Sequence, residues 1–367
     1  MTTAPTTPGR LTPPTAAAVL PVVHRRRAVV VTLALLVALV VAVVLAIGLG
    51  QLNIPPGEVI GSILHRIGLD WGPMPSHPNG EAALWNVRFP RVMMALLVGL
   101  ALGAAGAVMQ GVFGNPLADP AVIGVSSGAA VGACLVIVTG WAFLGVFTTA
   151  AAAFVFGLGT TLMMYVLARS DNRTEMVTLI LMGVAVNAIA SAAIAFLVFL
   201  GDTAAREQIV FWQLGSFNGS RWPAVAVVAP LALIGVVGTW LLGRQLDLLA
   251  LGERAARHIG VDVERLRIVA IVLVAVLVPG GVAFVGIIAF VGLVAPHLAR
   301  PLVGAGHRWL LGATALIGRR LRRAAARRAT RSERAVAAGR RTDPRTASRC
   351  RRRPRSRRGR AGQRRHH

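Results

Sequence analysis

Residues 103–130, GAAGAVMQGVFGNPLADPAVIGVSSGAA, consist of two apolar stretches on either side of a short turn, and this pattern decides the fold. Within the turn, Pro116 and Pro120 end helices, while Asn115 and Asp119 favour tight turns. Two helices joined by so short a link are antiparallel neighbours. The sequence therefore predicts a helical hairpin whose turn lies on the inner side of a membrane.

Arginines concentrated at the C-terminal end account for most of the net charge of +25. Residues 319–367 contain 21 arginines and two acidic residues, which gives +19; residues 1–318 contain 18 arginines and 12 acidic residues, which gives +6. The chain contains no lysine, which excludes a nucleotide-binding P-loop. Cys134 and Cys350 form neither a disulfide framework nor a pair with metal-ligand spacing.

Long apolar runs predict a polytopic membrane protein, because a hydrocarbon core about 30 Å thick requires roughly 20 residues of helix. The stretches expected to cross are 28–49, 92–111, 121–139, 141–168, 177–200, 223–242, 268–278 and 282–299. A ninth span begins near residue 309 and breaks off at Gly318. The expected fold class is therefore all-α.

The arginines also predict the orientation. With a cytoplasmic N-terminus, 13 arginines of residues 1–318 fall inside and five fall outside, which agrees with the positive-inside rule. The first six spans carry no Asp, Glu, Arg or His deep within them. Carriers coupled to protons or sodium usually keep such groups in the membrane, so the pattern favours a pathway powered from elsewhere.

Small residues at helical spacing predict where helices pack closely. Gly99 and Gly103 form one such face, and Gly124, Gly128 and Gly132 form a longer one. Helices in lipid associate through faces of this kind, so these glycines predict helix contacts rather than a binding site.

Two outer segments carry arginines or aromatic residues. Arg88 and Arg91 are either anchors at the membrane interface or a positive surface for an acidic partner. Residues 211–222, FWQLGSFNGSRW, alternate aromatic and small polar residues, which is typical of an element at the headgroup level.

The longest inner loop, residues 243–267, contains a short amphipathic pattern. Leu248, Leu251 and Ala255 recur at helical spacing opposite a charged face, and a glycine follows. Such a helix either lies on the membrane surface or docks a soluble partner. We favour docking, because a surface-lying helix is usually longer and carries larger apolar anchors.

Taken together, these segments resemble the FecCD-type permeases, the membrane subunits of ABC importers for iron-siderophores, haem and cobalamin. The motifs that carry the resemblance are RFPR (88–91), the 103–130 segment, FWQLGSFNGSRW (211–222), LDLLALGERAARHIGV (246–261) and FVGLVAPHLARPLVGAGHR (290–308). They extend over residues 28–318, nearly 80% of the chain (291 of 367 residues).

The resemblance implies ten helices in a permease subunit that imports an iron(III)-siderophore; haem or cobalamin import, or a secondary carrier without an ATPase, are the alternatives. The implied partners are an ABC ATPase subunit, an extracytoplasmic substrate-binding protein and a second permease subunit, with no nucleic acid. The implied location is the cytoplasmic membrane. The chain is then a transport subunit rather than an enzyme, with no catalytic residue, no metal ligand and no cofactor, because the ATPase subunit binds the ATP.

The resemblance also implies roles for individual residues. Arg88 and Arg91 match arginines that meet acidic residues of the binding protein. The residues implied in the inner gate are Asn115, Pro116 and Leu117. The residues implied in the helix that couples to the ATPase are Leu251, Gly252, Glu253, Arg254, Arg257 and Gly260.

After Gly318 the chain departs from the family pattern, which continues with A-D-x-x-A-R, E-L-P-x-G and a tenth span. We interpret residues 319–367 as a disordered, arginine-rich tail produced by a frameshift, since GC-rich alanine codons encode Arg and Pro in another frame. A genuine basic tail that binds anionic lipid or nucleic acid is the alternative. The expected organisation is a cytoplasmic tail over 1–27, a permease domain over 28–318, truncated after the start of helix nine, and this tail.

Overall fold

The computed structural model describes residues 25–48, 53–170 and 173–303, all within one unit that extends from Met1 to Gly318. The predicted ninth span and the arginine-rich tail lie outside the described residues, as does the N-terminal tail up to residue 24. The first helix begins at Arg25, three residues before the predicted start of the permease domain.

The regular secondary structure of the described residues is helical apart from one short β-hairpin. The α-helices are α1 (Arg25–Gly48), α2 (Pro56–Arg66), α3 (Gly80–Ala83), α4 (Phe89–Phe113), α5 (Val125–Thr139), α6 (Thr148–Leu167), α7 (Met176–Leu200), α8 (Thr203–Leu214), α9 (Trp222–Leu249), α10 (Glu253–His258), α11 (Val263–Val285) and α12 (Val291–Val303). The short elements are η1 (Leu84–Arg88), η2 (Pro120–Ile123), η3 (Gly145–Phe147) and the antiparallel strands β1 (Arg169–Ser170) and β2 (Arg173–Thr174). The all-α prediction is confirmed.

Six helices of the described chain are long and apolar enough to cross a membrane. They are Val30–Gly48, Gly80–Phe113, Gly145–Leu167, Met176–Leu200, Trp222–Leu249 and Val263–Val285. The first five contain or overlap predicted spans. The predicted span 121–139 corresponds to η2 and the shorter apolar helix α5. The chain is therefore a multi-pass membrane protein.

The prediction of separate spans at 268–278 and 282–299 is wrong. Pro279 and the two glycines after it lie inside the single helix α11, and the chain leaves the helix only at Gly286 (φ 76°). Proline is tolerated in a membrane helix where a neighbouring helix packs against it. Here a Cβ on Gly157 of α6 would lie 3.1 Å from the Pro279 ring, so α6 packs directly on the proline.

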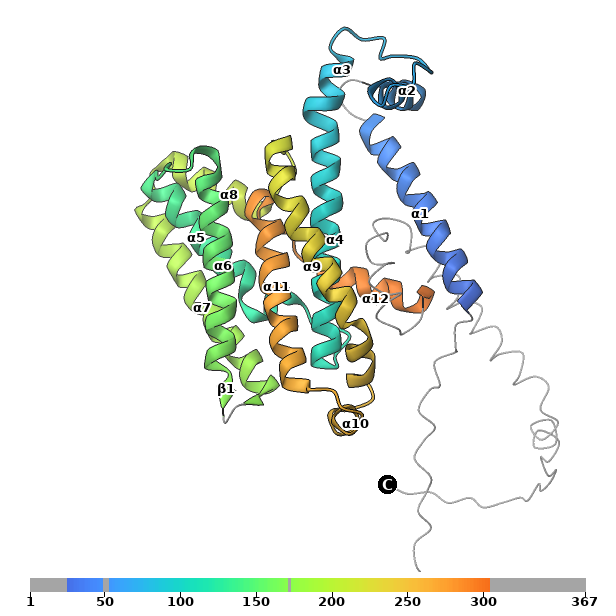
Figure 1. Ribbon diagram of the computed structural model, residues 1–367. Helices are drawn as coiled ribbons and strands as arrows, with labels where there is room; N and C mark the ends of the chain where they lie inside the picture. The colour runs from blue at the N-terminus through green and yellow to red at the C-terminus, as the bar shows by residue number, and fades with distance from the viewer. Residues whose placement is uncertain (1–24, 49–52, 171–172, 304–367) are drawn as a thin grey trace, which may run out of the picture. The chain divides into compact units, whose positions relative to one another are not determined.

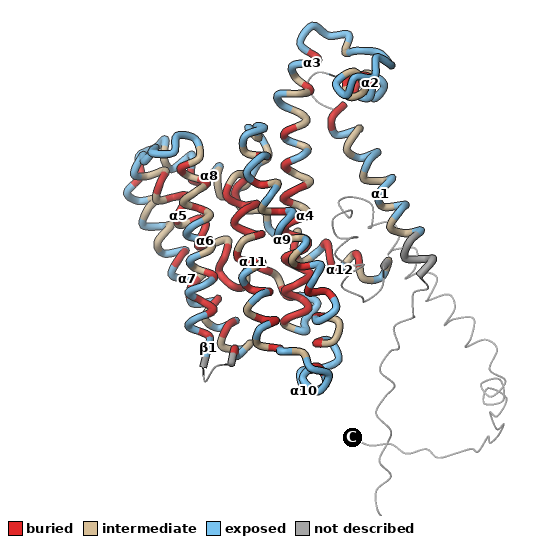
Figure 2. Tube along the Cα trace, in the orientation of Figure 1, coloured by how far each residue is buried: buried red, intermediate tan, exposed pale blue. Residues whose placement is uncertain are grey.

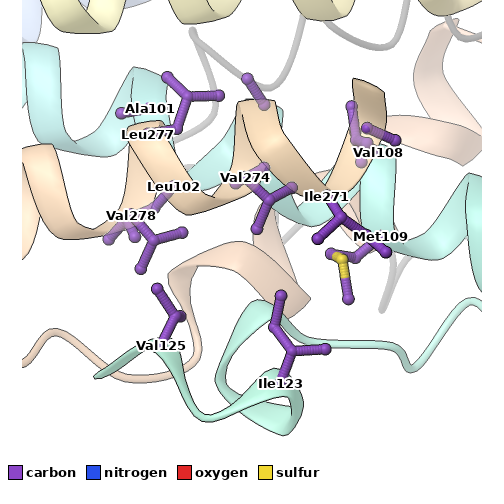
Figure 3. Packing of buried hydrophobic residues seen from close by; sticks show 14 of the residues in the cluster. Ala101, Leu102, Val108, Met109, Ile123, Val125, Ile271, Val274, Leu277 and Val278 are labelled. Atoms are coloured by element: carbon purple, nitrogen blue, oxygen red, sulfur yellow. The ribbon is translucent and has the colours of Figure 1, made fainter. Parts of the chain in front are cut away.

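Burial separates the inner helices from the outer ones (Figure 2). The most apolar windows of the Gly80–Phe113 and Val263–Val285 helices are each 67% buried, whereas those of α7 and α1 are 17% and 6% buried. α4 packs against α9, α11 and α12, and α5 packs against α6 and α7 (Figure 1). In Figure 3, Leu102 and Met109 of α4 lie close to Ile271 and Val278 of α11.

Glycine permits close approach at some of the predicted packing positions. A Cβ on Gly128 would lie 2.2 Å from Thr160 Oγ1, and a Cβ on Gly132 would lie 2.5 Å from the Ala152 carbonyl oxygen, so both let α5 contact α6. Gly124 has φ 71°, which caps the start of α5.

The packing role of the other predicted face stays a prediction. Around Gly99 a Cβ would meet nothing within 4 Å among the described residues. Gly103 is buried in α4. A close approach lies one turn later, at Gly106, where a Cβ would be 1.8 Å from the Gly292 carbonyl oxygen of α12. Sequence analysis did not single out Gly106, because its partner is 186 residues away.

Candidate functional site

Predicted site residues lie at two opposite ends of the described helices (Figure 1). The end that carries α10 and the β1–β2 hairpin is called the α10 end, and the end that carries α2 and α3 is called the α2 end. The predicted coupling residues lie at the α10 end. Arg88 is the last residue of η1, and Arg91 lies in the first turn of α4, toward the α2 end.

α10 is a six-residue helix between two glycine turns. Gly252 precedes it with φ 106°, and Gly260 follows it with φ 92°; both angles favour glycine over any residue with a Cβ. Ala256 is buried and fixes the helix against the rest of the bundle. Both glycines named as coupling residues thus shape the backbone on either side of the helix.

The charged side chains of α10 differ in their contacts. Arg254 and Arg257 are exposed, and Leu251 just before the helix is 67% exposed. Arg257 Nη2 lies 3.6 Å from Glu253 Oε2. Glu253 also forms an ion pair with Arg267 of α11, so its carboxylate ties α10 to α11. The coupling role of these residues stays a prediction, but Glu253 has a different position from the two arginines.

Behind Glu253, buried polar groups form a cluster that sequence analysis missed. Glu264, in the first turn of α11, accepts hydrogen bonds from the Thr174 backbone N–H (3.2 Å) and the Thr174 hydroxyl. The Tyr165 hydroxyl of α6 lies 3.5 Å from Glu264 Oε1. Arg267, which is only 7% exposed, places Nη1 3.9 Å from Glu264 Oε2 and 3.5 Å from the Thr174 carbonyl oxygen. We call Glu253, Glu264, Arg267 and Thr174 the Arg267 cluster.

Only a weak signal for this cluster is present in the sequence. Glu264 and Arg267 have the i, i+3 spacing of a helical ion pair, but they were counted among the charges of an inner loop. Thr174 is 93 residues from Arg267 along the chain. Its approach to α11 depends on how α6 and α11 pack, which no local pattern specifies.

The predicted gate residues form an exposed turn at the C-terminal end of α4. Gly114 ends the helix in the left-handed conformation (φ 59°). The Asn115 side-chain oxygen accepts the Leu117 backbone N–H at 2.9 Å, which closes the turn. Asn115, Pro116 and Leu117 are all exposed, and Leu117 is 65% exposed. Their turn geometry agrees with the sequence; the gating role stays a prediction.

A cavity of about 280 Å³ follows this turn. Asp119 and Pro120 line it from one side, and Val278 lines it from α11. Residues between 287 and 293, in the segment that leads into α12, also line it. Among the described residues, Phe290 is the only one other than glycine with a positive φ, 65°. A bulky residue in this conformation is strained, which marks the entry to α12 as a constrained point of the backbone.

At the α2 end the two predicted docking arginines differ. Arg88 Nη1 donates hydrogen bonds to the carbonyl oxygens of Ile47 (2.6 Å) and Gly48 (2.9 Å), which are the last residues of α1. Such carbonyls have no partner within their own helix. Arg88 is therefore partly buried and joins α1 to the start of α4, whereas Arg91 is exposed.

Aromatic side chains add further contacts at this end. The Trp222 indole N–H, from the predicted interfacial segment, donates to the Trp85 carbonyl oxygen at 2.7 Å. The Trp85 indole N–H in turn donates to the Ser62 hydroxyl at 3.0 Å, and the Arg66 guanidinium lies 5.0 Å from the Trp85 ring centre. Trp222 therefore connects α9 to the segment before α4, while its predicted place at a membrane interface stays a prediction.

A comparison with protein families identifies the chain. The model of the FecCD transport family matches residues 38–326. The chain belongs to this family. The match confirms the resemblance drawn from the motifs, and it ends eight residues beyond Gly318, the predicted point of departure. As a FecCD-family member, the chain is an ABC importer permease.

The curated relatives are named for several different cargoes. The hemin transport system permease HmuU of Yersinia pestis is 38% identical over 243 residues, 64% of this chain and 72% of the relative. The molybdate permease MolB of Haemophilus influenzae is 36% identical over 78% of this chain and 82% of its own length. The Fe(3+)-citrate permease YfmE of Bacillus subtilis is 36% identical over 80% of this chain and 84% of its own length.

A solved structure also has the same fold. It is described as an inward-facing, metal-chelate type ABC transporter, and it aligns with a TM-score of 0.68 at 33% sequence identity. The alignment covers 78% of this chain and 85% of that chain. The chain therefore has the fold of an ABC transporter permease.

Proposed function

We propose that this FecCD chain represents the permease subunit of an iron(III)-siderophore importer, which works with an ABC ATPase subunit, an extracytoplasmic binding protein and a second permease subunit. The observation that carries the proposal is α10, a short exposed helix at one end of the bundle, anchored by Ala256 and Glu253. Its exposed arginines, Arg254 and Arg257, suit the recognition of an acidic groove on a soluble partner.

The iron chelate is supported by the family and by relatives named for hemin and Fe(3+)-citrate. Haem, cobalamin and molybdate remain competing cargoes, because relatives are named for each. The proposed orientation places the N-terminus and α10 in the cytoplasm. It follows from the arginine bias, since positive loops resist translocation.

Binding to the ATPase subunit tests the partner part of the proposal. The chain and its candidate ATPase are co-expressed and purified through a tag on the chain. We expect the ATPase to co-purify with the wild type and to be largely lost from Arg254→Glu, which places a negative charge on the exposed face of α10. Arg91→Glu is a matched control, because Arg91 is also exposed but lies in the first turn of α4, away from α10. Equal recovery of the ATPase with all three proteins would refute docking through α10.

Uptake of labelled cargo tests the substrate and the frameshift together. The chain as it stands is compared with a version continued after Gly318 in the frame that restores A-D-x-x-A-R and E-L-P-x-G. We expect ATP-dependent uptake of iron-siderophore by the continued version and little by the chain as it stands. Uptake driven by a proton gradient without ATPase supports a secondary carrier instead. Full-rate uptake by the chain as it stands argues against the frameshift, as does finding neither motif in the other frames.

A further inference from the structure

The Arg267 cluster joins elements that are far apart in the sequence. Glu253 belongs to α10, Glu264 and Arg267 belong to α11, and Thr174 belongs to β2, two residues before α7 begins. Thr174 is held at both backbone polar groups: its N–H donates to Glu264 at 3.2 Å, and its carbonyl oxygen accepts from Arg267 at 3.5 Å. The start of α7 is thereby tied to α11.

Arg267 is the central residue of the cluster. Its guanidinium pairs with Glu253 through Nη2 and with Glu264 through Nη1. The side chain is 9% exposed, and its Nε has no hydrogen-bond partner among the residues that the structure describes. A buried cation with one donor already unsatisfied depends strongly on the two carboxylates that remain. A displacement of Glu253 therefore changes the balance of contacts at Arg267.

Packing contacts also connect α10 with the hairpin. α10 packs against α9 and α11, and α11 packs against β2. Within α10, Ala256 is the buried side chain, and its methyl group makes no polar contact. The polar link from α10 to Thr174 thus passes through Glu253 and Arg267.

We propose that Arg267 is a positioning residue that passes displacements of α10 to Thr174 and so to the N-terminal end of α7. This rests on the proposed function in one respect: the docked ATPase is what moves α10. Glu253 is then the inner end of the link, and the exposed arginines of α10 meet the partner. Glu264 keeps Thr174 in place while Arg267 responds to Glu253.

Hydrogen exchange of the purified chain tests the link without any partner. In Glu253→Gln the ion pair between Glu253 and Arg267 is weakened, while the contacts of Arg267 and Glu264 with Thr174 keep their own atoms. We expect the Thr174 amide to exchange roughly fivefold faster, because Arg267 then holds the hairpin less firmly. Arg254→Gln, an exposed change on the same helix, is the control and should leave the exchange unchanged. An unchanged rate in Glu253→Gln overturns the proposal.

A double-mutant cycle separates the link from general loosening. Thr174→Val removes the hydroxyl that bonds Glu264 but leaves the hairpin backbone in place. Combined with Glu253→Gln, it should speed exchange by clearly less than the product of the two single effects, because both act on one cluster. Fully multiplicative effects would mean that Glu253 and Thr174 act independently, which contradicts the link.

The complex with the ATPase provides the last measurement. Trapping the ATPase with ATP and vanadate should change the exchange rate of the Thr174 amide in the wild type. In Glu253→Gln the rate after trapping should stay within twofold of the rate before trapping. An equal change in both proteins contradicts transmission through Arg267. If the wild type does not bind the ATPase, the proposed function fails, whereas the exchange of the isolated variants still decides whether α10 and the hairpin are linked.

Discussion

The two ends of the FecCD chain use arginine in different ways. At the α10 end, Arg267 is buried between the carboxylates of Glu253 and Glu264. At the α2 end, Arg88 is partly buried and donates to the carbonyl oxygens of Ile47 and Gly48. One arginine depends on neighbouring charges and the other on a helix terminus, so replacing them should have different costs and different consequences.

The largest effect is expected from Arg267→Met. This substitution removes the cation that Glu253 and Glu264 share. We expect a cost of at most about 3 kcal/mol, the low end for breaking a buried ion pair, because Glu253 is 43% exposed and still contacts Arg257. Denaturant unfolding of the purified protein in detergent measures the loss in the free energy of unfolding. Replacing both carboxylates as well, by Gln, should recover part of the stability; no recovery would show that the charges themselves are not the cause.

Arg88→Met should have a smaller effect at the other end. It removes hydrogen bonds from a charged donor to two carbonyl oxygens at a helix end, which are worth about 1.5 to 3 kcal/mol. The same unfolding measurement applies, with Arg91→Met as the exposed control three residues away. The proposed difference between the two ends is wrong if Arg88→Met lowers the free energy of unfolding as much as Arg267→Met does. It is also wrong if Arg91→Met lowers it as much as Arg88→Met does.

Binding rather than stability should change at the exposed arginines of α10. Arg254→Glu is expected to weaken binding of the ATPase by about tenfold, while the melting temperature of the isolated chain stays unchanged. Surface plasmon resonance with the immobilised ATPase measures the affinity. A lower melting temperature with unaltered affinity would assign Arg254 to the fold instead.

The smallest effect is expected at Arg91. Because Arg91 is exposed, charge reversal to Glu should slow association with the binding protein about threefold at low salt, and the difference should shrink as salt is added. Stopped-flow mixing measures the association rate. An equal effect from Arg88→Met would contradict the separation of the two arginines into a docking residue and a structural one.

Much of the transmembrane arrangement was predictable, because the length of an apolar run is a local property. The runs around α1, α7 and α9 were identified from composition alone, and each corresponds to a helix. The exception was α11. The Pro279-Gly-Gly sequence is a local helix breaker, but the α6 surface at Gly157 accepts the proline ring, and the helix continues to Val285.

The candidate site was predictable only in part. The amphipathic pattern and Gly260 predicted a short helix in this loop, and α10 is there. The predicted face also included Leu248 and Leu251, but Leu248 belongs to α9 and Leu251 precedes the turn at Gly252, so the helix begins only at Glu253. The different contacts of Glu253 and Arg254 were not foreseen, because i, i+1 neighbours on a helix point in different directions and only the packed bundle decides what each meets.

The sequence by itself determined the class of molecule: a helical membrane protein with a nearly neutral body, a strongly basic end and the motifs of its family. Those properties depend on composition and short-range spacing. Tertiary structure alone decided the contact between Gly106 and Gly292, the position of Arg88 at the end of α1 and the burial of Arg267 against Thr174. Each joins residues at least 40 positions apart, and such contacts form only when the helices pack.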